Sequence, residues 1–265
     1  GTNLVLDVIE NGLVYDITPV DSTANLTTPF TTTISLKAVT VHDVAHGQTA
    51  GTPINVNTYA AVDGIVIQGV YIIQSITDAD NYVINVASAA TSSTSGGLTS
   101  LFTTTMSSTD VVVTLNNHGF VANQTFTVAV STIVGGITFL GAYNVDSVVD
   151  ANNFHITGGA SASSATSGRE NGSNVKISYL LAAGNADAGV ASGYGVGGYG
   201  LGTYGYGVSN GKVTPPREWY FAPWGGDMIC APSNGAMYYW NAANGLVSNP
   251  ATLIATAPTF SPAIV

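Results

Sequence analysis

Residues 64–86 read GIVIQGVYIIQSITDADNYVINV, and residues 136–158 read GITFLGAYNVDSVVDANNFHITG. A gapless offset of 72 residues aligns Gly64 with Gly136, Tyr71 with Tyr143 and Asp78 with Asp150. Self-similarity at a fixed offset is typical of a repeated structural unit. In each copy, runs rich in β-branched and aromatic residues flank a polar turn, which predicts a β-hairpin.

The similarity continues outward from the hairpin in both directions. His46-Gly47 aligns with His118-Gly119, and Thr94-Ser95-Gly96 aligns with Thr166-Ser167-Gly168. Strands this short and closely spaced predict two tandem small β-barrels or compact sandwiches. The turn residues retained in both copies are His46, Gly47, Gly64, Gly69, Tyr71, Asp78 and Asn81, and their counterparts His118, Gly119, Gly136, Gly141, Tyr143, Asp150 and Asn153.

The two ends of the chain also resemble each other. Asn11-Gly12 and Asn234-Gly235 each separate two apolar runs, which is the strongest short-range signal for a hairpin. We therefore expect an all-β protein in which the two modules are inserted into a sheet, of the β-propeller type, built from both ends. The predicted segments are a hairpin at 1–32, modules at 33–98 and 99–170 (the latter including a connector), a strand and Gly/Tyr-rich loop at 171–218, and a hairpin at 219–265.

Composition favours strands and argues against direct binding to nucleic acid. Of the 265 residues, 45% are hydrophobic and only 8% are charged, and the net charge is −10. Five cations form no cluster of the kind that neutralises phosphates. An acidic surface instead suits a channel through which DNA slides.

The single cysteine and the chain ends carry further expectations. Cys230 lies in an apolar run, which predicts a buried thiol and no disulfide framework. The chain has no apolar run of the length that a membrane span needs. It begins Gly-Thr and ends in an apolar segment, so we expect both ends to continue into a longer polypeptide.

The candidate chemical sites favour structural roles. His42 and His46 are four residues apart, which on a strand separates them by about 13 Å, too far to share a metal ion. His46 and His118 are interpreted as binding turn backbone, and Asp78 as capping a turn, with calcium as the alternative. No Ser/His/Asp arrangement can be assembled, so we expect neither an enzyme, nor a metal site, nor a cofactor.

Aromatic residues are the candidates for an interface. Glycines separate Tyr194, Tyr199, Tyr204 and Tyr206, and a GxGxxG match at Gly193 lacks the strand and helix of a nucleotide site. The tyrosines are interpreted as packing on a neighbouring subunit or on the chain's own sheet, with stacking on bases or sugars as the alternative. Trp219, Trp224 and Trp240 are interpreted as core of the closing sheet, with a carbohydrate platform as the alternative.

The motifs resemble a known family. The pattern of His46-Gly47, Asp63-Gly64-Ile65, Gly69-Val70-Tyr71 and Asp78-Ala79-Asp80-Asn81-Tyr82 resembles a module recurrent in phage virion proteins, which is similar to the small β domain inserted in ubiquitin-activating enzymes. The flanks, including Pro29-Phe30 and the segment from Trp224 to Trp240, resemble tail hub and packaged-DNA stabilisation proteins of short-tailed bacteriophages.

The resemblance implies a structural subunit of the virion. It would form a homohexameric ring, a hub or nozzle, below the portal and adaptor proteins, and DNA would only pass through its channel. The first alternative is a virion-surface adhesin that binds host glycan. The second is a polysaccharide depolymerase, which would need paired carboxylates that the comparison of the two copies does not show.

Overall fold

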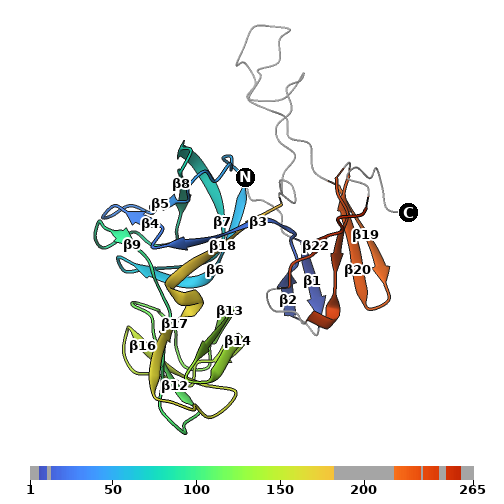
Figure 1. The fold of residues 1–265 in the computed structure, drawn as a ribbon. Helices are drawn as coiled ribbons and strands as arrows, with labels where there is room; N and C mark the ends of the chain where they lie inside the picture. Colours follow the sequence, from blue (N-terminus) through green and yellow to red (C-terminus); the bar gives the residue numbers. More distant parts are fainter. Residues whose placement is uncertain (1–5, 11–12, 182–217, 234, 245–248, 258–265) are drawn as a thin grey trace, which may run out of the picture. The chain divides into compact units, whose positions relative to one another are not determined.

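The protein is built almost entirely of β-strands. The computed structural model describes residues 6–10, 13–181, 218–233, 235–244 and 249–257, and within them it contains strands, turns and two short 3-10 helices but no α-helix (Figure 1). None of the helices in this part of the chain could cross a lipid bilayer. The all-β prediction is therefore confirmed.

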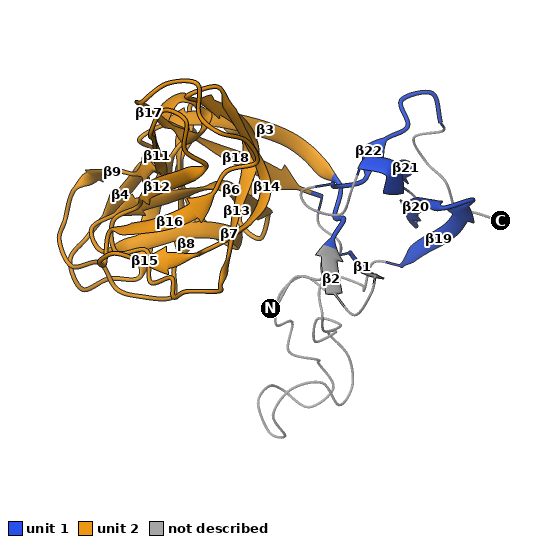
Figure 2. Ribbon diagram, turned by 90° about the horizontal axis from the view of Figure 1, so that it is seen from below, with its two compact units in different colours: residues 1–19, 181–265 blue, residues 20–180 orange. Residues whose placement is uncertain are grey.

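The chain divides into two compact units (Figure 2). Unit 1 combines residues 1–19 with residues 181–265, and unit 2 comprises Val20–Leu180. The elements of unit 1 are β1 (Asp7–Glu10), β2 (Leu13–Asp16), β19 (Trp219–Trp224), β20 (Asp227–Pro232), β21 (Tyr238–Trp240), η2 (Ala242–Asn244) and β22 (Thr252–Leu253).

Unit 1 is held together by contacts between the two ends of the chain. β1 pairs antiparallel with β2, and β19 to β22 form an antiparallel four-stranded sheet in chain order. Leu6 and Ile17 share a buried cluster with Cys230, Tyr238 and Trp240. Residues far apart in sequence thus enclose one core, and unit 2 is an insertion between them.

Unit 2 contains two sets of strands that follow the sequence repeat. Its elements are β3 (Val20–Thr27), β4 (Phe30–Thr32), β5 (Ala38–His42), β6 (Pro53–Val62), β7 (Ile65–Asp78), β8 (Asn81–Asn85), β9 (Ser95–Gly96), β10 (Leu98–Thr99), β11 (Leu101–Thr104), β12 (Asp110–Thr114), β13 (Thr125–Val134), β14 (Ile137–Asn144), β15 (Ser147–Val148), β16 (Asn153–Thr157), β17 (Thr166–Arg169), η1 (Glu170–Ser173) and β18 (Asn174–Leu180). We call residues 30–96 the first repeat and residues 102–168 the second repeat.

Three strands of the first repeat begin and end at residues equivalent to those of the second. β5, β6 and β8 lie 72 residues before β12, β13 and β16, with identical lengths. The long β7 corresponds to β14 followed by β15. Sheet order agrees as well, since β8-β5-β4-β9 in the first repeat corresponds to β16-β12-β11-β17 in the second.

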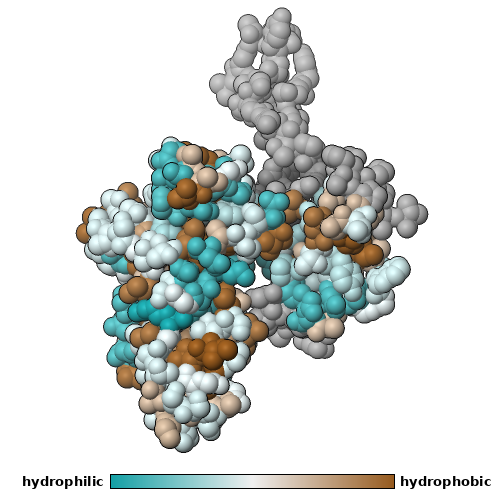
Figure 3. All heavy atoms as spheres, in the orientation of Figure 1, coloured by the Kyte–Doolittle hydropathy of each residue, from teal (hydrophilic) through white to brown (hydrophobic). Residues whose placement is uncertain are grey.

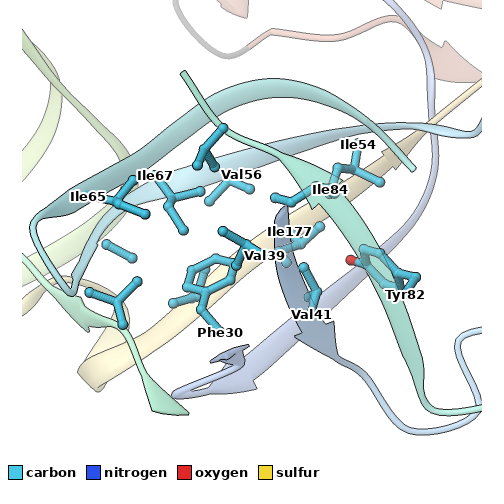
Figure 4. Packing of buried hydrophobic residues seen from close by; sticks show 14 of the residues in the cluster. Phe30, Val39, Val41, Ile54, Val56, Ile65, Ile67, Tyr82, Ile84 and Ile177 are labelled. Carbon is cyan, nitrogen blue, oxygen red and sulfur yellow. The ribbon is translucent and has the colours of Figure 1, made fainter. Parts of the chain in front are cut away.

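The buried residues recur at the same offset. Alternation along each strand directs every second side chain inward, which fills one core per repeat. Figure 4 shows the first core. Its members Phe30, Val39, Val41, Ile54, Val56, Val62, Ile65, Ile67, Ile73, Tyr82, Ile84 and Ala90 correspond to Phe102, Val111, Val113, Phe126, Val128, Val134, Ile137, Phe139, Val145, Phe154, Ile156 and Ala162.

Two predicted boundaries differ from the structure. The insertion starts at Val20, so β3 and β4 belong to unit 2 and not to a terminal hairpin of residues 1–32. The connector expected at the start of the second module contains β11, whose Phe102 is completely buried. The strand was not predicted because the sequence around it is rich in Ser and Thr. Leu101–Thr104 nevertheless alternates between half-buried and buried positions.

The two repeats differ at one sheet edge. In the first repeat β6 pairs with β18, which also pairs with β3, so the strands that enter and leave unit 2 extend that sheet. In the second repeat β13 and β14 form a two-stranded sheet. Because β3 and β18 exist once and the repeat twice, only one copy receives this extension.

Candidate functional site

The retained histidines lie in matching turns and bind backbone. His46 Nδ1 accepts a hydrogen bond from the Gln48 amide at 2.9 Å, and its Nε2 lies 3.3 Å from the Asp78 carbonyl oxygen. His118 makes the same two bonds, with the Phe120 amide at 2.9 Å and the Asp150 carbonyl at 3.0 Å. Since Nδ1 accepts, Nε2 must carry the proton and donate. Both ring nitrogens are therefore engaged.

The retained aspartates organise the hairpin turns. Asp78 Oδ1 accepts hydrogen bonds from the Asp80 amide at 2.8 Å and from Asn81 Nδ2 at 2.9 Å. Asp150 makes the equivalent bonds to Asn152 and Asn153, at 2.7 and 3.0 Å. In both cases these donors hold the pKa of the aspartate below its ordinary value, with the backbone amide as the largest cause. Each carboxylate thus stabilises its hairpin turn.

The replacement of Asp80 by Asn152 leaves its contact unchanged. Asp80 Oδ1 accepts from the Ala45 amide at 2.8 Å, and Asn152 Oδ1 accepts from the Asn117 amide at 3.0 Å. An amide oxygen satisfies this donor as well as a carboxylate oxygen does. The negative charge of Asp80 is consequently not required for the turn.

The retained Gly-x-Tyr segments share one local geometry. Gly69 and Gly141 have φ values of 96° and 95°, which only glycine adopts without strain. The nearby tyrosine hydroxyls accept hydrogen bonds from backbone amides, Tyr71 from Gln68 at 3.3 Å and Tyr143 from Leu140 at 3.1 Å. The remaining retained glycines, Gly47, Gly64, Gly119 and Gly136, also have positive φ.

Asp63 is a polar centre that only the first repeat possesses. One carboxylate oxygen accepts from Ser92 Oγ at 2.5 Å, and the other accepts from Thr32 Oγ1 and from the amide and hydroxyl of Thr94. These bonds, that from Ser92 first, lower the pKa of Asp63 to about 2. The second repeat has Gly135 at this position, and Thr104 there donates directly to the Ser164 carbonyl.

A shallow depression of about 330 Å³ lies beside the second His-Gly turn. Its lining includes His118, Phe120, Val148 and Asp150. His118 cannot offer an imidazole nitrogen to a ligand there, because both are bonded to backbone. Within the described residues, no three His, Cys, Asp or Glu side chains are grouped so that they could hold a metal ion.

The contact between the repeats was not apparent from the sequence. Tyr59 on β6 lies with its ring centre 5.6 Å from that of Phe120 and 5.1 Å from that of Phe126. Ala61 and Val66 of the first repeat also pack against the second core. The repeat alignment could not identify this contact, because Tyr59 corresponds to Ser131 and has no aromatic counterpart.

Glu170 also lies at this contact, and its role was not apparent from the sequence. Its side chain is completely buried, and neither carboxylate oxygen has a hydrogen-bond partner of normal geometry in the structure. Burial raises the pKa of Glu170 to about 8, while the nearby amides of Val130 and Ala129 oppose the shift. The only sequence signal was rarity, since the chain has three glutamates and position 98, its counterpart, is leucine.

The segment around Glu170 joins three strands of unit 2. The Glu170 amide donates to the Ser100 carbonyl at 2.9 Å, and Thr99 Oγ1 donates to the Glu170 carbonyl at 3.1 Å. The Asn171 amide donates to Thr132 Oγ1 at 3.1 Å, and its side chain donates to Asn25 at 3.0 Å. This segment therefore links β3, β10 and β13.

The predicted interface aromatics occupy different environments. Trp240 is buried and its Nε1 donates to the Asn249 carbonyl at 3.1 Å, whereas Trp224 is 67% exposed. Trp219 is half-buried, with its ring 6.5 Å from Tyr238. Cys230 is buried, which raises its thiol pKa to about 11. Tyr194, Tyr199, Tyr204 and Tyr206 lie outside the described residues.

No protein-family model matches the chain, and no curated protein matches it.

Proposed function

We propose that the chain is a non-enzymatic structural subunit of the virion, of the tail hub or nozzle type of short-tailed bacteriophages. The observation that carries the proposal is the insertion of unit 2 into a sheet unit that both chain ends build. The sequence resemblance implies this arrangement of small β modules within a sheet scaffold. The Leu6–Ile17 region and the Cys230–Trp240 region share one core, as such a scaffold requires.

The matching strands and cores support two tandem small β modules. The equivalence extends beyond sequence to hydrogen bonds, such as Thr31 with Ser95 at 3.0 Å and Thr103 with Ser167 at 2.9 Å. Equivalent contacts at nonidentical core positions, such as Ile67 and Phe139, favour duplication of a folding unit over a shared short motif.

The bonding of the retained polar residues supports a structural role. Catalytic groups need a free lone pair or proton directed at a substrate. The nitrogens of His46 and His118 and the carboxylates of Asp78 and Asp150 instead bind turn atoms of their own repeat. What the duplication has preserved is turn geometry.

The four-stranded antiparallel sheet β19–β22 supports a blade of a β-propeller, because such blades are four-stranded sheets of this topology. We further propose a homohexameric ring that contacts portal and adaptor proteins. A net charge of −10 would keep DNA from adhering to the channel as it passes.

Electron cryomicroscopy of the intact virion tests this function. Density for the chain in a ring at the tail, with DNA-facing acidic residues, is the expected result. The chain's absence from purified particles, or its presence only on peripheral fibres, would overturn the proposal. Mass spectrometry of purified particles gives an independent reading of copy number.

A glycan-binding adhesin is the second candidate, and one observation favours it. Phe221 and Trp224 on β19 are 51% and 67% exposed, and apolar ring faces in water are a feature of sugar-binding surfaces. A glycan array with the whole chain and with Trp224→Ala tests it. Binding that disappears in the variant supports the adhesin, and absence of binding to any glycan counts against it.

A further inference from the structure

The outer face of the β13–β14 hairpin is uncharged and carries two large apolar side chains that are exposed. Ile133 is 71% exposed and Leu140 is 57% exposed, and Ser131 and Thr138 are exposed beside them. Ile133 lies directly opposite Thr138 in the strand register. Figure 3 shows hydrophobic surface in this part of unit 2. The face carries no charged side chain.

The equivalent face of the first repeat is covered. Tyr59, Ala61 and Val66 are the counterparts of Ser131, Ile133 and Thr138, and they pack against the core of the second repeat. Ala61 is only 8% exposed, whereas Ile133 at the same position is 71% exposed. One module thus has this face covered by the other module, whereas Ile133 on the same face of the second module is exposed among the described residues.

The edge of the same hairpin is also unpaired. Among the described strands β14 pairs only with β13, so its outer edge has no partner strand there. Its sequence, ITFLGAYN, contains neither a charge nor a proline. Proteins usually protect a long edge strand with charges, proline or short length, because an unprotected edge accepts another strand.

We propose that the edge of β14 forms a contact between two copies of this chain, with β14 of each copy pairing antiparallel across a two-fold axis, which joins the outer faces of the two hairpins into one surface. A two-fold contact needs a self-complementary surface, and an uncharged strand opposes no like charges when it meets itself. The pairing would bring Leu140 of one copy close to Leu140 of the other. Such a contact closes on two copies, so it is separate from the contacts that build a ring and goes beyond the proposed function.

Disulfide cross-linking of the whole chain tests the proposed two-fold contact directly. Leu140→Cys should yield a covalent dimer under mild oxidation, since the native Cys230 is buried and does not compete. Val121→Cys is the matched control, because Val121 is 58% exposed but lies outside any strand. Equal cross-linking of both variants, or none at position 140, would overturn the proposal.

Sedimentation equilibrium supplies the second measurement. Leu140→Lys and Thr138→Lys place charges on the pairing strand, and Leu140→Lys sets like charges of the two copies close together, so each should weaken dimerisation at least about tenfold, whereas Val121→Lys should not. Circular dichroism checks that each variant is folded. A wild-type chain that stays monomeric in sedimentation equilibrium contradicts the proposed β14 contact. This outcome does not depend on whether the protein belongs to a phage tail.

Discussion

The Nε2 atom of His118 lies 3.0 Å from the carbonyl oxygen of Asp150, and this bond joins the two turns at one end of the second repeat. The ring also packs edge-on against Phe154, with 4.9 Å between ring centres. One side chain thus connects the His-Gly turn, the hairpin turn and the core. His46 connects the same three features in the first repeat, through Asp78 and Tyr82.

We expect His118→Ala to destabilise unit 2. The substitution removes two hydrogen bonds and a ring contact from a side chain that is 8% exposed, which should lower the free energy of unfolding by about 2–4 kcal/mol. All three tryptophans belong to unit 1, so their fluorescence serves as an internal control for that unit. The circular dichroism transition should shift while the tryptophan transition stays in place.

His42→Ala is the matched control for this prediction. His42 is exposed and its imidazole bonds the exposed Asn81 side chain, so its replacement should change stability by less than about 0.5 kcal/mol. If both variants lose the same stability, His118 does not have the connecting role assigned to it.

The repeat could be predicted from sequence because its signals are local. Positions such as Gly69 and Gly141 need a backbone that only glycine adopts, and Asp78 and Asp150 bond atoms within three residues. Because these requirements involve residues close together in sequence, the same residue types recur at the same spacing in both repeats. The strands between them followed from alternation.

The joint between the repeats could not be predicted, because its contacts are neither local nor duplicated. Tyr59 meets Phe120 across 61 positions of sequence, and Glu170 meets residues of β10 and β13. Pairing of β18 with β3 likewise depends on where the chain returns after both repeats. β11 was missed for another reason, since Thr103 and Thr104 resemble a polar connector although their strand is half-buried.

We expect Asp63→Asn to destabilise the first repeat and to change its response to acid. The folded-state pKa of Asp63 is about 2, below the ordinary value of 3.8. Its carboxylate therefore stabilises the fold above about pH 3.8, and this contribution is lost as the pH falls towards 2. Denaturation by urea at pH 2 and pH 5 should show a smaller difference in the variant than in the wild type. An unchanged difference would contradict the assignment.

The glycines of the Gly-x-Tyr segments test whether the two repeats are structurally equivalent. No heavy atom lies within 4 Å of a methyl group added at Gly69 or Gly141, so alanine there costs only backbone strain. At φ near 95° we expect each Gly→Ala variant to lose about 1–2 kcal/mol or more. Thermal unfolding should show similar losses at both sites, and Gly226→Ala, which is also uncrowded but lacks positive φ, should show little loss.

We expect Glu170→Gln to stabilise unit 2 at alkaline pH. The folded-state pKa of about 8 exceeds the ordinary value of 4.5, so the unfolded chain releases this proton first as the pH rises. The native fold therefore loses stability between about pH 4.5 and pH 8, by on the order of several kcal/mol for a completely buried carboxyl. Glutamine keeps the shape of the neutral acid and cannot ionise.

The measurement is urea denaturation of the two proteins at pH 5 and pH 8.5, followed by circular dichroism. At pH 5 the wild type and the variant should have similar stability, and at pH 8.5 the variant should be the more stable. Hydrogen exchange of peptides from β10 and β13 should slow in the variant at pH 8.5, because these strands pack around the Glu170 segment. Parallel stability curves at both pH values would mean that Glu170 is ionised in the folded protein and that its burial is offset by other contacts.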